Sequence, residues 1–302
     1  MEERDVGLAE LLAEVRRIEV QSDRLVNGLL AGAYRSVFRG AGVEFDEVRE
    51  YQEGDDPRAV DWNVTARVGR PFVKTYVDER DLTVLFLLDV SRSMRAGFGP
   101  WSARGAAARV CACLALSAAR SHDKVGLVAF ADGVERIVPP RQGTPHALRI
   151  VRDCLALPDG RGRTDLAPAL ERAARMVRRH AVVFVVSDFL FDGFGSTLAA
   201  SARRHDVVAV RLLLPELEPP DLGLLRGRDP ESGRATVVDW GSAKVRSAYA
   251  ARVEAWRAGH DRELARAGVD VIDVPVPRHE GESVARPLVD FFRMRERRGT
   301  KR

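Results

Sequence analysis

The chain has 302 residues, of which 45% are hydrophobic and 30% are charged, and its formal net charge is +4. These values are typical of a soluble globular protein and exclude a disordered one. Only four of the 48 basic residues are lysines, and the arginines are interleaved with 44 acids. Because the sequence has no basic stripe with interleaved aromatic residues, we expect no nucleic-acid partner.

The apolar runs and the cysteines indicate the cellular compartment of the protein. The longest runs, "TVLFLLDV" and "AVVFVVS", are far shorter than the ~18 residues that a membrane span needs. The first residues are charged and do not have the pattern of a signal peptide. Cys111, Cys113 and Cys154 have neither the spacing of a disulfide framework nor that of a metal site. We therefore expect a cytoplasmic protein with no membrane span.

Residues 1–81 are predicted to form an N-terminal elaboration with helical and β-rich parts. Apolar residues at helical spacing over 7–31 predict an amphipathic helix, broken near Ser22, that packs on the main domain. Short β-like pieces follow at 43–48 and 71–76.

The segment Glu44–Asp61 carries eight acids and two arginines, and Trp62 follows it. One interpretation is that the acids dock on a basic face of a partner protein, with Trp62 as an anchor. The other is that Asp55, Asp56 and Asp61 serve turns and an ion pair with Arg58 or Arg67, and that Trp62 packs between two subdomains. We expect the packing role for Trp62, and both interpretations of the acids stay open.

Residues 82–295 are predicted to form the main domain, and residues 296–302 a basic tail. Continuous apolar runs are typical of strands buried on both faces of a parallel sheet. The Asp132–Gly133 pair predicts a hairpin turn, which makes one edge strand antiparallel. The pattern therefore predicts an α/β fold with a doubly wound, mostly parallel sheet. We expect strands over 83–90, 124–130, 134–140, 181–187, 206–214 and 269–276, and helices over about 102–121, 144–156, 165–179, 196–204 and 242–267.

Several enzyme motifs are missing from the sequence. It has no phosphate-binding GxxxxGKS or GxxxxGKT, no GxGxxG after a strand, no HExxH and no GxSxG. The six histidines are scattered without metal-ligand spacing. We therefore expect a protein that is not an enzyme.

Oxygen-bearing side chains follow two of the predicted strands and precede one predicted helix. Asp89, Ser91 and Ser93 alternate at the end of the first strand, Thr164 lies in a glycine-rich turn, and Asp188 follows strand 181–187. In an open α/β sheet, ligands bind beyond the carboxyl ends of the strands. Carboxylates and hydroxyls are hard oxygen ligands suited to Mg²⁺ or Mn²⁺. The alternative is that Ser93 and Thr164 cap helices and that Asp188 starts a turn.

Two parts of the sequence resemble known families. Asp89-x-Ser91-x-Ser93 with Thr164 and Asp188 is similar to the metal-ion-dependent adhesion site of a von Willebrand factor A domain. The stretch "YQEGDDPRAVDWN" and its surroundings resemble the bacterial family called domain of unknown function 58, over about residues 25–295. The resemblance implies a von Willebrand factor A-like fold and an association with MoxR-type AAA+ ATPases.

The resemblance also implies how a divalent cation, Mg²⁺ or Mn²⁺, is held. Ser91 and Ser93 would bind it through their hydroxyls, and Thr164 directly or through water. Asp89 and Asp188 would act from the outer sphere. Because hydroxyls are neutral ligands, the ion would remain electrophilic, and one position would accept a carboxylate from a partner protein.

The function implied is that of a non-catalytic, divalent-cation-dependent interaction module. It would be an adaptor of a MoxR-type AAA+ ATPase in protein assembly or remodelling, with a client protein donating the carboxylate. One alternative is a Mg²⁺-dependent phosphotransferase or phosphatase with Asp89 as nucleophile, but such sites want a second acid where Ser91 stands. Another is a structural scaffold with a degenerate site. Asp165 either supports the cation site or interacts with the dipole of the next helix.

Overall fold

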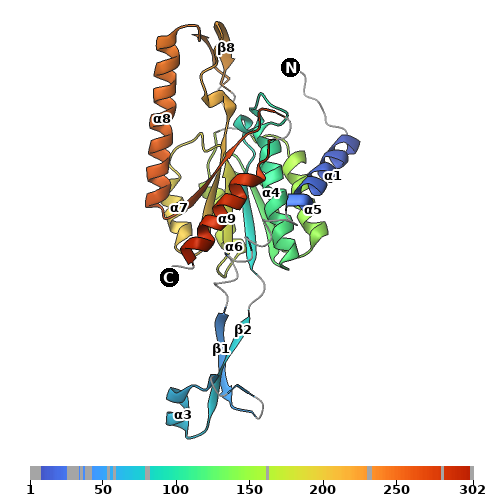
Figure 1. Cartoon of the computed structure of the whole chain (residues 1–302), viewed down its shortest axis with the longest axis vertical. Coiled ribbons are helices and arrows are strands. Elements are labelled where there is room, and N and C mark those ends of the chain that lie inside the picture. Colours follow the sequence, from blue (N-terminus) through green and yellow to red (C-terminus); the bar gives the residue numbers. More distant parts are fainter. Residues whose placement is uncertain are drawn as a thin grey trace.

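The structure is a computed structural model, and it describes residues 8–25, 34, 37, 43–52, 55–56, 59–78, 82–160, 163–229, 233–279 and 282–299. Figure 1 shows a layered α/β body and an arm that projects from one end of it. The arm consists of β1 (Val43–Glu50), α3 (Trp62–Val68) and β2 (Phe72–Asp78).

A six-stranded sheet lies at the centre of the body. Its strand order is β10-β7-β6-β3-β4-β5, and only the edge strand β5 runs antiparallel to its neighbour. This confirms the prediction of a doubly wound, mostly parallel sheet with one antiparallel edge strand. The strands are β3 (Thr83–Asp89), β4 (Lys124–Phe130), β5 (Val134–Arg141), β6 (Val182–Ser187), β7 (Asp206–Leu213) and β10 (Asp270–Pro275).

Helices cover both faces of the sheet (Figure 1). Helices α4, α5 and α9 pack on one face, and α6, α7 and α8 pack on the other. Helix α1 (Leu8–Leu25) lies on α4 and α5, where Ile18 is fully buried, which confirms the predicted packing of the N-terminal helix. The other helices are α4 (Ala103–Arg120), α5 (Thr144–Ala156), α6 (Ala167–Met176), α7 (Gly195–Ala202), α8 (Ala243–Arg266) and α9 (Ala285–Gly299).

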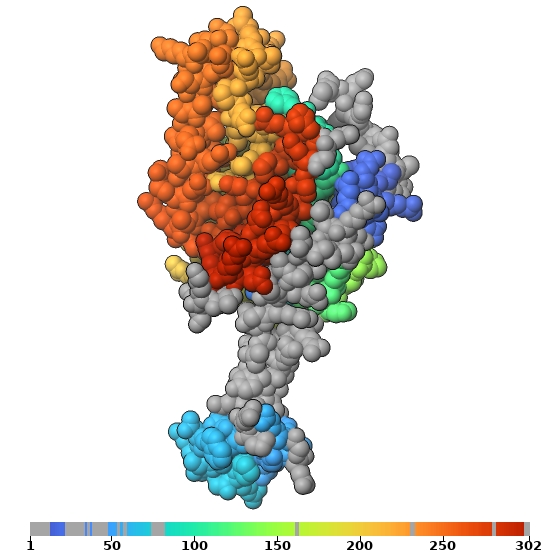
Figure 2. Space-filling view, viewed as in Figure 1, coloured from blue at the N-terminus to red at the C-terminus, as the bar shows by residue number. Residues whose placement is uncertain are grey.

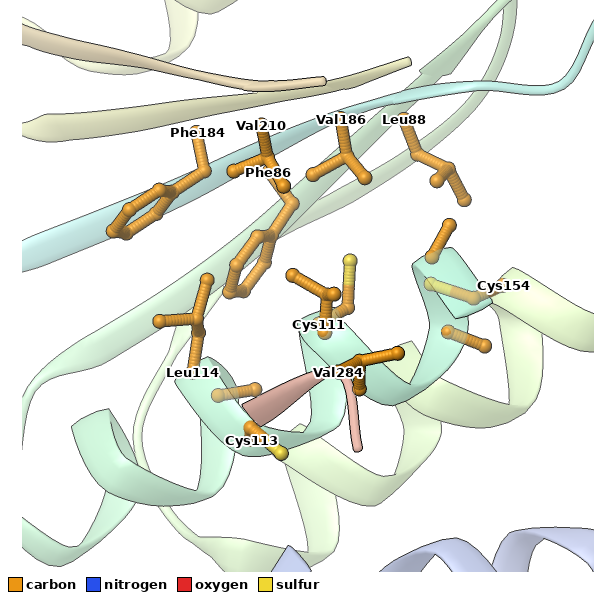
Figure 3. Packing of buried hydrophobic residues seen from close by; sticks show 14 of the residues in the cluster. Phe86, Leu88, Cys111, Cys113, Leu114, Cys154, Phe184, Val186, Val210 and Val284 are labelled. Atoms are coloured by element: carbon orange, nitrogen blue, oxygen red, sulfur yellow. The ribbon is translucent and has the colours of Figure 1, made fainter. Parts of the chain in front are cut away.

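The cysteines belong to the apolar core. Figure 3 shows Cys111, Cys113 and Cys154 among the buried side chains around helices α4 and α5, with Cys113 on the side of α4 that points away from the sheet. All three are free thiols. The small alanines around the cysteines let α4 approach the sheet closely. The buried cysteines act here as small hydrophobic side chains.

Hydrogen bonds and an ion pair within the arm stabilise its local structure. Asp61 precedes α3, and its Oδ1 accepts hydrogen bonds from the backbone N–H groups of Asn63 at 2.9 Å and Val64 at 3.3 Å. Asp55 pairs with Arg49 at 2.7 Å. Asp61 therefore serves a helix start and Asp55 an ion pair, but the partner of Asp55 is Arg49 and not the expected Arg67. Arg58, the other expected partner, lies outside the described residues.

Trp62 corrects one prediction. Its side chain is 73% exposed on α3, at the tip of the arm, which forms a separate lobe in Figure 2. The expected packing between two subdomains is therefore wrong. The cause is the hairpin itself, which carries α3 away from the body (Figure 1).

Three further elements differ from the expectations. Helix α1 is continuous through Ser22 rather than broken there, and residues 26–31 lie outside the described residues. The hairpin of β8 (Leu224–Arg228) and β9 (Ala235–Asp239) was expected to be a connection without strands. Helix α9 was also not expected, and it continues through Gly299. None of the helices among the described residues has the length and apolar character needed to cross a membrane.

The described part of the body also contains two short 3₁₀ helices, η4 (Arg92–Arg95) and η5 (Pro215–Leu217). η4 follows β3 directly, and η5 follows β7 directly. Both therefore lie at the carboxyl edge of the sheet, whereas the arm connects to the amino end of β3. The two edges are opposite ends of the body (Figure 1).

Candidate cation site

Asp89 is held at the carboxyl end of the central strand. Residues Val84–Leu88 of β3 are fully buried between the two helical layers, and Asp89 ends the strand with no solvent exposure. Its Oδ1 accepts a hydrogen bond from the backbone N–H of Ser91 at 2.8 Å. Its Oδ2 accepts one from the hydroxyl of Ser187 at 2.6 Å. Both oxygens of the carboxyl group are therefore fixed in direction.

Ser91 and Ser93 lie side by side at the start of η4. Both are buried, and their Oγ atoms are 3.0 Å apart. Two adjacent corners of a Mg²⁺ octahedron with ligand distances of 2.0–2.1 Å are separated by about 2.9 Å. The alternative role of Ser93 as the cap of the next helix is wrong, because Ser102 caps α4 through a hydrogen bond from Gly105 N at 3.2 Å.

Asp188 lies one residue beyond β6, the neighbour of β3 in the sheet. Its side chain is buried, and its Oδ1 accepts a hydrogen bond from Leu190 N at 3.0 Å. Burial, and then the charge of Asp188, raise the pKa of Asp89 to about 7. Two buried carboxyl groups therefore lie at the carboxyl ends of two neighbouring strands, and a cation beside them would reduce their repulsion.

A loop brings Thr164 to the same edge. The backbone N–H of Gly160 donates to Val90 O at 2.8 Å, and that of Asp165 donates to Ala131 O at 2.7 Å. These acceptors directly follow β3 and β4, so the half-buried Thr164 lies beyond the ends of these two strands. Gly160 is required at this position, because a Cβ atom there would lie 2.0 Å from the Cβ of Ala131.

Asp165 serves the following helix. Its Oδ1 accepts a hydrogen bond from the backbone N–H of Ala167, the first residue of α6, at 2.9 Å, and the side chain is exposed. This contact favours the helix-start interpretation of Asp165 over the supporting role.

Sequence reasoning missed Ser187. Its hydroxyl donates to Asp89 and accepts a hydrogen bond from Phe189 N at 2.9 Å, so it ties the ends of β3 and β6 together. The only signal in the sequence is a single polar residue at the end of the apolar run "VVFVVS". Arg92, between the two serines, is exposed, and nothing in the structure explains its identity.

The residues present fit a hard divalent cation. The structure brings together Asp89, Ser91, Ser93 and Asp188, and backbone hydrogen bonds place Thr164 at the same edge. The donors are hydroxyl and carboxyl oxygens, which suit Mg²⁺ and Mn²⁺ and do not suit zinc. Among the described residues, no group of three or more His, Cys, Asp or Glu side chains is arranged to hold a metal.

The chain is similar to several mycobacterial proteins. It is 30% identical to the uncharacterized protein Rv1480 of Mycobacterium tuberculosis (strain H37Rv) over 280 residues, which cover 91% of this chain and 87% of that one. It is 31% identical to the uncharacterized protein MAV169 of Mycobacterium avium over 147 residues, covering 47% of this chain and 85% of that one.

Similar solved structures include the conserved hypothetical protein BatB of Bacteroides thetaiotaomicron, at 18% identity and a TM-score of 0.46, covering 72% of this chain and 99% of that one. The VWA domain of SpRpn10 has 11% identity and a TM-score of 0.38, covering 68% of this chain and 93% of that one. The profile of the family described as "Protein of unknown function DUF58" matches residues 47–259. With this match and the identity to Rv1480 over most of both chains, the chain belongs to the DUF58 family.

Proposed function

We propose that the chain is a non-catalytic protein-interaction module that works through a divalent cation, Mg²⁺ or Mn²⁺. In this proposal Ser91, Ser93 and Thr164 hold the ion, and Asp89 and Asp188 balance its charge. The observation that carries the proposal is the pair of adjacent serine hydroxyls beside two buried carboxyl groups at one strand edge. A carboxylate of a client protein completes the coordination of the ion.

The setting of Asp89 supports a non-catalytic role. A nucleophilic carboxylate needs an oxygen that is open to the substrate. Both oxygens of Asp89 already accept hydrogen bonds, from Ser91 N and from Ser187 Oγ, and the residue has no solvent exposure. Ser91 stands where a general acid would be needed, and a serine is a poor proton donor at neutral pH.

We also propose that the module is an adaptor of a MoxR-type AAA+ ATPase in the cytoplasm. The support is the arm, which leaves the body at the edge opposite the cation site and exposes Trp62 (Figure 1). An exposed tryptophan on a projecting element is typical of a protein contact. When the arm binds the ATPase, the cation site at the opposite end of the body stays accessible to a client. The three free, buried thiols are in keeping with a reducing compartment.

The test is a binding measurement between the full chain and the MoxR-type ATPase of the same organism, with a candidate client as the second analyte. Since the ATPase itself binds Mg²⁺ with nucleotide, the cation site is removed by S91A/S93A at constant Mg²⁺, and S247A on the exposed surface of α8 is the matched control. We expect S91A/S93A to lose client binding and keep ATPase binding, and W62A to do the reverse. Unchanged binding in both variants contradicts the proposal.

A further inference from the structure

A cavity of about 340 Å³ lies at the carboxyl edge of the sheet. Its walls are formed by the ends of β7 and β10, by η5 and by α8. The Tyr249 hydroxyl donates to Glu216 O at 3.0 Å and so holds α8 against η5. Protein pockets that bind small ligands range from about 300 to 1,000 Å³, so the cavity is large enough to receive part of another molecule.

The lining of the cavity is mostly apolar, with one unsatisfied donor. Leu214, Leu217, Val253 and Val276 are among the apolar side chains of its wall. Arg257 also lines it, and its Nε atom is buried and has no hydrogen-bond partner in the described part of the chain. A buried donor without an acceptor is unfavourable, so a carbonyl oxygen brought in by a ligand would satisfy it.

Two of the charged residues that line the cavity already pair with each other. Arg278 forms an ion pair with Glu218 at 2.6 Å, and both residues line the cavity. Arg257 is therefore the wall residue whose donor has most to gain from a ligand. An apolar space with a single carbonyl-binding donor fits a peptide segment with an apolar side chain better than it fits an ion.

One loop after the two serines approaches the wall of the cavity. Gly99 follows η4, and a Cβ atom on it would lie 1.9 Å from Pro277 O. This loop therefore lies directly against Pro277, whose neighbours Val276 and Arg278 line the cavity. Phe98, on the same loop, is 81% exposed. An exposed aromatic side chain on a loop that follows the two serines is typical of a protein-binding surface.

The strand order sets the distance between the two sites. The cation site lies at the ends of β3 and β6, and the cavity lies at the ends of β7 and β10, two strands further along the sheet. Neighbouring strands are about 4.8 Å apart, so the separation is about 10 Å. An extended chain covers this distance in about three residues.

We propose that the cavity binds an apolar side chain of the same peptide segment that donates its carboxylate to the cation. The segment is extended, and its aliphatic or aromatic residue lies three or four positions from an Asp or Glu. The Nε–H of Arg257 donates a hydrogen bond to a backbone carbonyl oxygen of this segment. The inference rests on the proposed function, because it describes the client that the cation site binds.

The experiment uses fluorescein-labelled, glycine-rich peptides with one Asp and one Leu, at separations from one to seven positions, and the full chain in Mg²⁺. Fluorescence anisotropy measures the affinities, with Asp-only and Leu-only peptides as references. We expect the Leu to tighten binding at least tenfold at a separation of three or four positions. V253R, which fills the cavity, removes this gain but not the binding of the Asp-only peptide. R257Q reduces the gain, and R262Q, on the exposed surface of α8, leaves it unchanged.

The outcomes separate this inference from the proposed function. If the Asp-only peptide binds with Mg²⁺ and the Leu adds nothing at any separation, the inference is wrong and the cation proposal stands. If the gain persists in V253R, the apolar side chain binds elsewhere and the inference is also wrong. If no Asp-containing peptide depends on Mg²⁺, the proposed function fails, and the inference fails with it.

Discussion

At the scale of single residues, Asp89 and Asp188 determine the charge at the carboxyl ends of β3 and β6. Both are buried, and burial together with the charge of Asp188 raises the pKa of Asp89 to about 7. Without a cation, such a pair opposes folding, because two desolvated carboxylates repel each other. The same pair favours the binding of a divalent ion.

The substitution D89N tests this balance. It removes one of the two buried charges and keeps an acceptor for the Ser91 N–H. In EDTA we expect the Tm to rise by about 2 °C, as ~1 kcal/mol of stabilisation produces in a protein of this size. Mg²⁺ should raise the Tm of the wild type and not that of D89N. Thermal unfolding with and without Mg²⁺ measures both effects.

The control for this substitution is D132N, which changes an exposed carboxylate in the turn after β4. It should leave the Tm and the response to Mg²⁺ unchanged. A D89N protein that is stabilised by Mg²⁺ as much as the wild type would show that Asp89 has no role in cation binding.

His205 makes the stability depend on pH. Its ring is buried, and neither ring nitrogen has a hydrogen-bond partner within the described residues. Burial, and then the charges of Arg204 and His180, lower the pKa of His205 below its ordinary value. The unfolded chain takes up this proton at about pH 6.5, whereas the folded chain does so only at lower pH.

The contribution of His205 to the free energy of unfolding should therefore fall as the pH is lowered from 7 to 5, because at this residue the unfolded state binds more protons in this window. H205Q should make this slope shallower, and H279Q, which changes an exposed histidine, should not. Urea unfolding at each pH gives the slopes. Equal slopes for H205Q and the wild type would show that His205 is not the group responsible.

At the scale of elements, the loop between α5 and α6 positions Thr164. Gly160 lets this loop approach the end of β4, since a Cβ atom would lie 2.0 Å from that of Ala131. We expect G160A to lower the free energy of unfolding by about 1–3 kcal/mol, as overpacking does, and to weaken cation binding by displacing Thr164. G227A, whose new Cβ atom would meet nothing within 4 Å, is the control. If G160A unfolds in urea like the wild type, the contact with Ala131 is not as close as described.

The arm projects from the body, and Trp62 lies exposed on it. Since Trp62 is 73% exposed, W62A removes few packing contacts. We expect the Tm of W62A to stay within 1 °C of the wild type, as is usual for surface substitutions. F292A, which removes a fully buried ring of α9, is the destabilising reference. A large loss of stability in W62A would restore the interpretation that Trp62 packs between subdomains.

The sequence was informative where burial dominates. The apolar runs of β3 and β6 predict buried parallel strands, and the polar residues that follow them predict the edge at which Asp89, Ser91, Ser93 and Asp188 meet. The sequence was not informative for β8 and β9, whose residues are almost all exposed and therefore show no apolar alternation. Propensity and pattern in such a hairpin carry little signal.

Helix α9 was missed for a different reason. Its many arginines suggest a solvated tail, but Arg295 forms ion pairs with Asp206 at 2.6 Å and Asp270 at 2.6 Å, and Phe292 is fully buried. These contacts join residues far apart in the chain. Tertiary partners of this kind cannot be identified from local spacing. Ser187 is similar, because its role depends on the neighbouring strand. The predicted division into residues 1–81, 82–295 and 296–302 stays a prediction.

At the scale of the whole molecule, the two candidate contact regions lie at opposite ends. The cation site and the adjacent cavity lie at the carboxyl edge of the sheet, and the arm with Trp62 leaves from the amino edge (Figure 1). Separate ends allow two partners to bind at once without competing for the same surface. This arrangement is what an adaptor between an ATPase and its client requires.

The cation site can be tested by a Mn²⁺ titration of the full chain, with free Mn²⁺ followed by electron paramagnetic resonance. We expect one bound Mn²⁺ per chain, displaced by Mg²⁺. We also expect at least tenfold weaker binding in S91A/S93A and unchanged binding in S247A. If the chain does not bind Mn²⁺, or S91A/S93A binds it as well as the wild type does, the serine and carboxyl groups at this edge do not form a cation site.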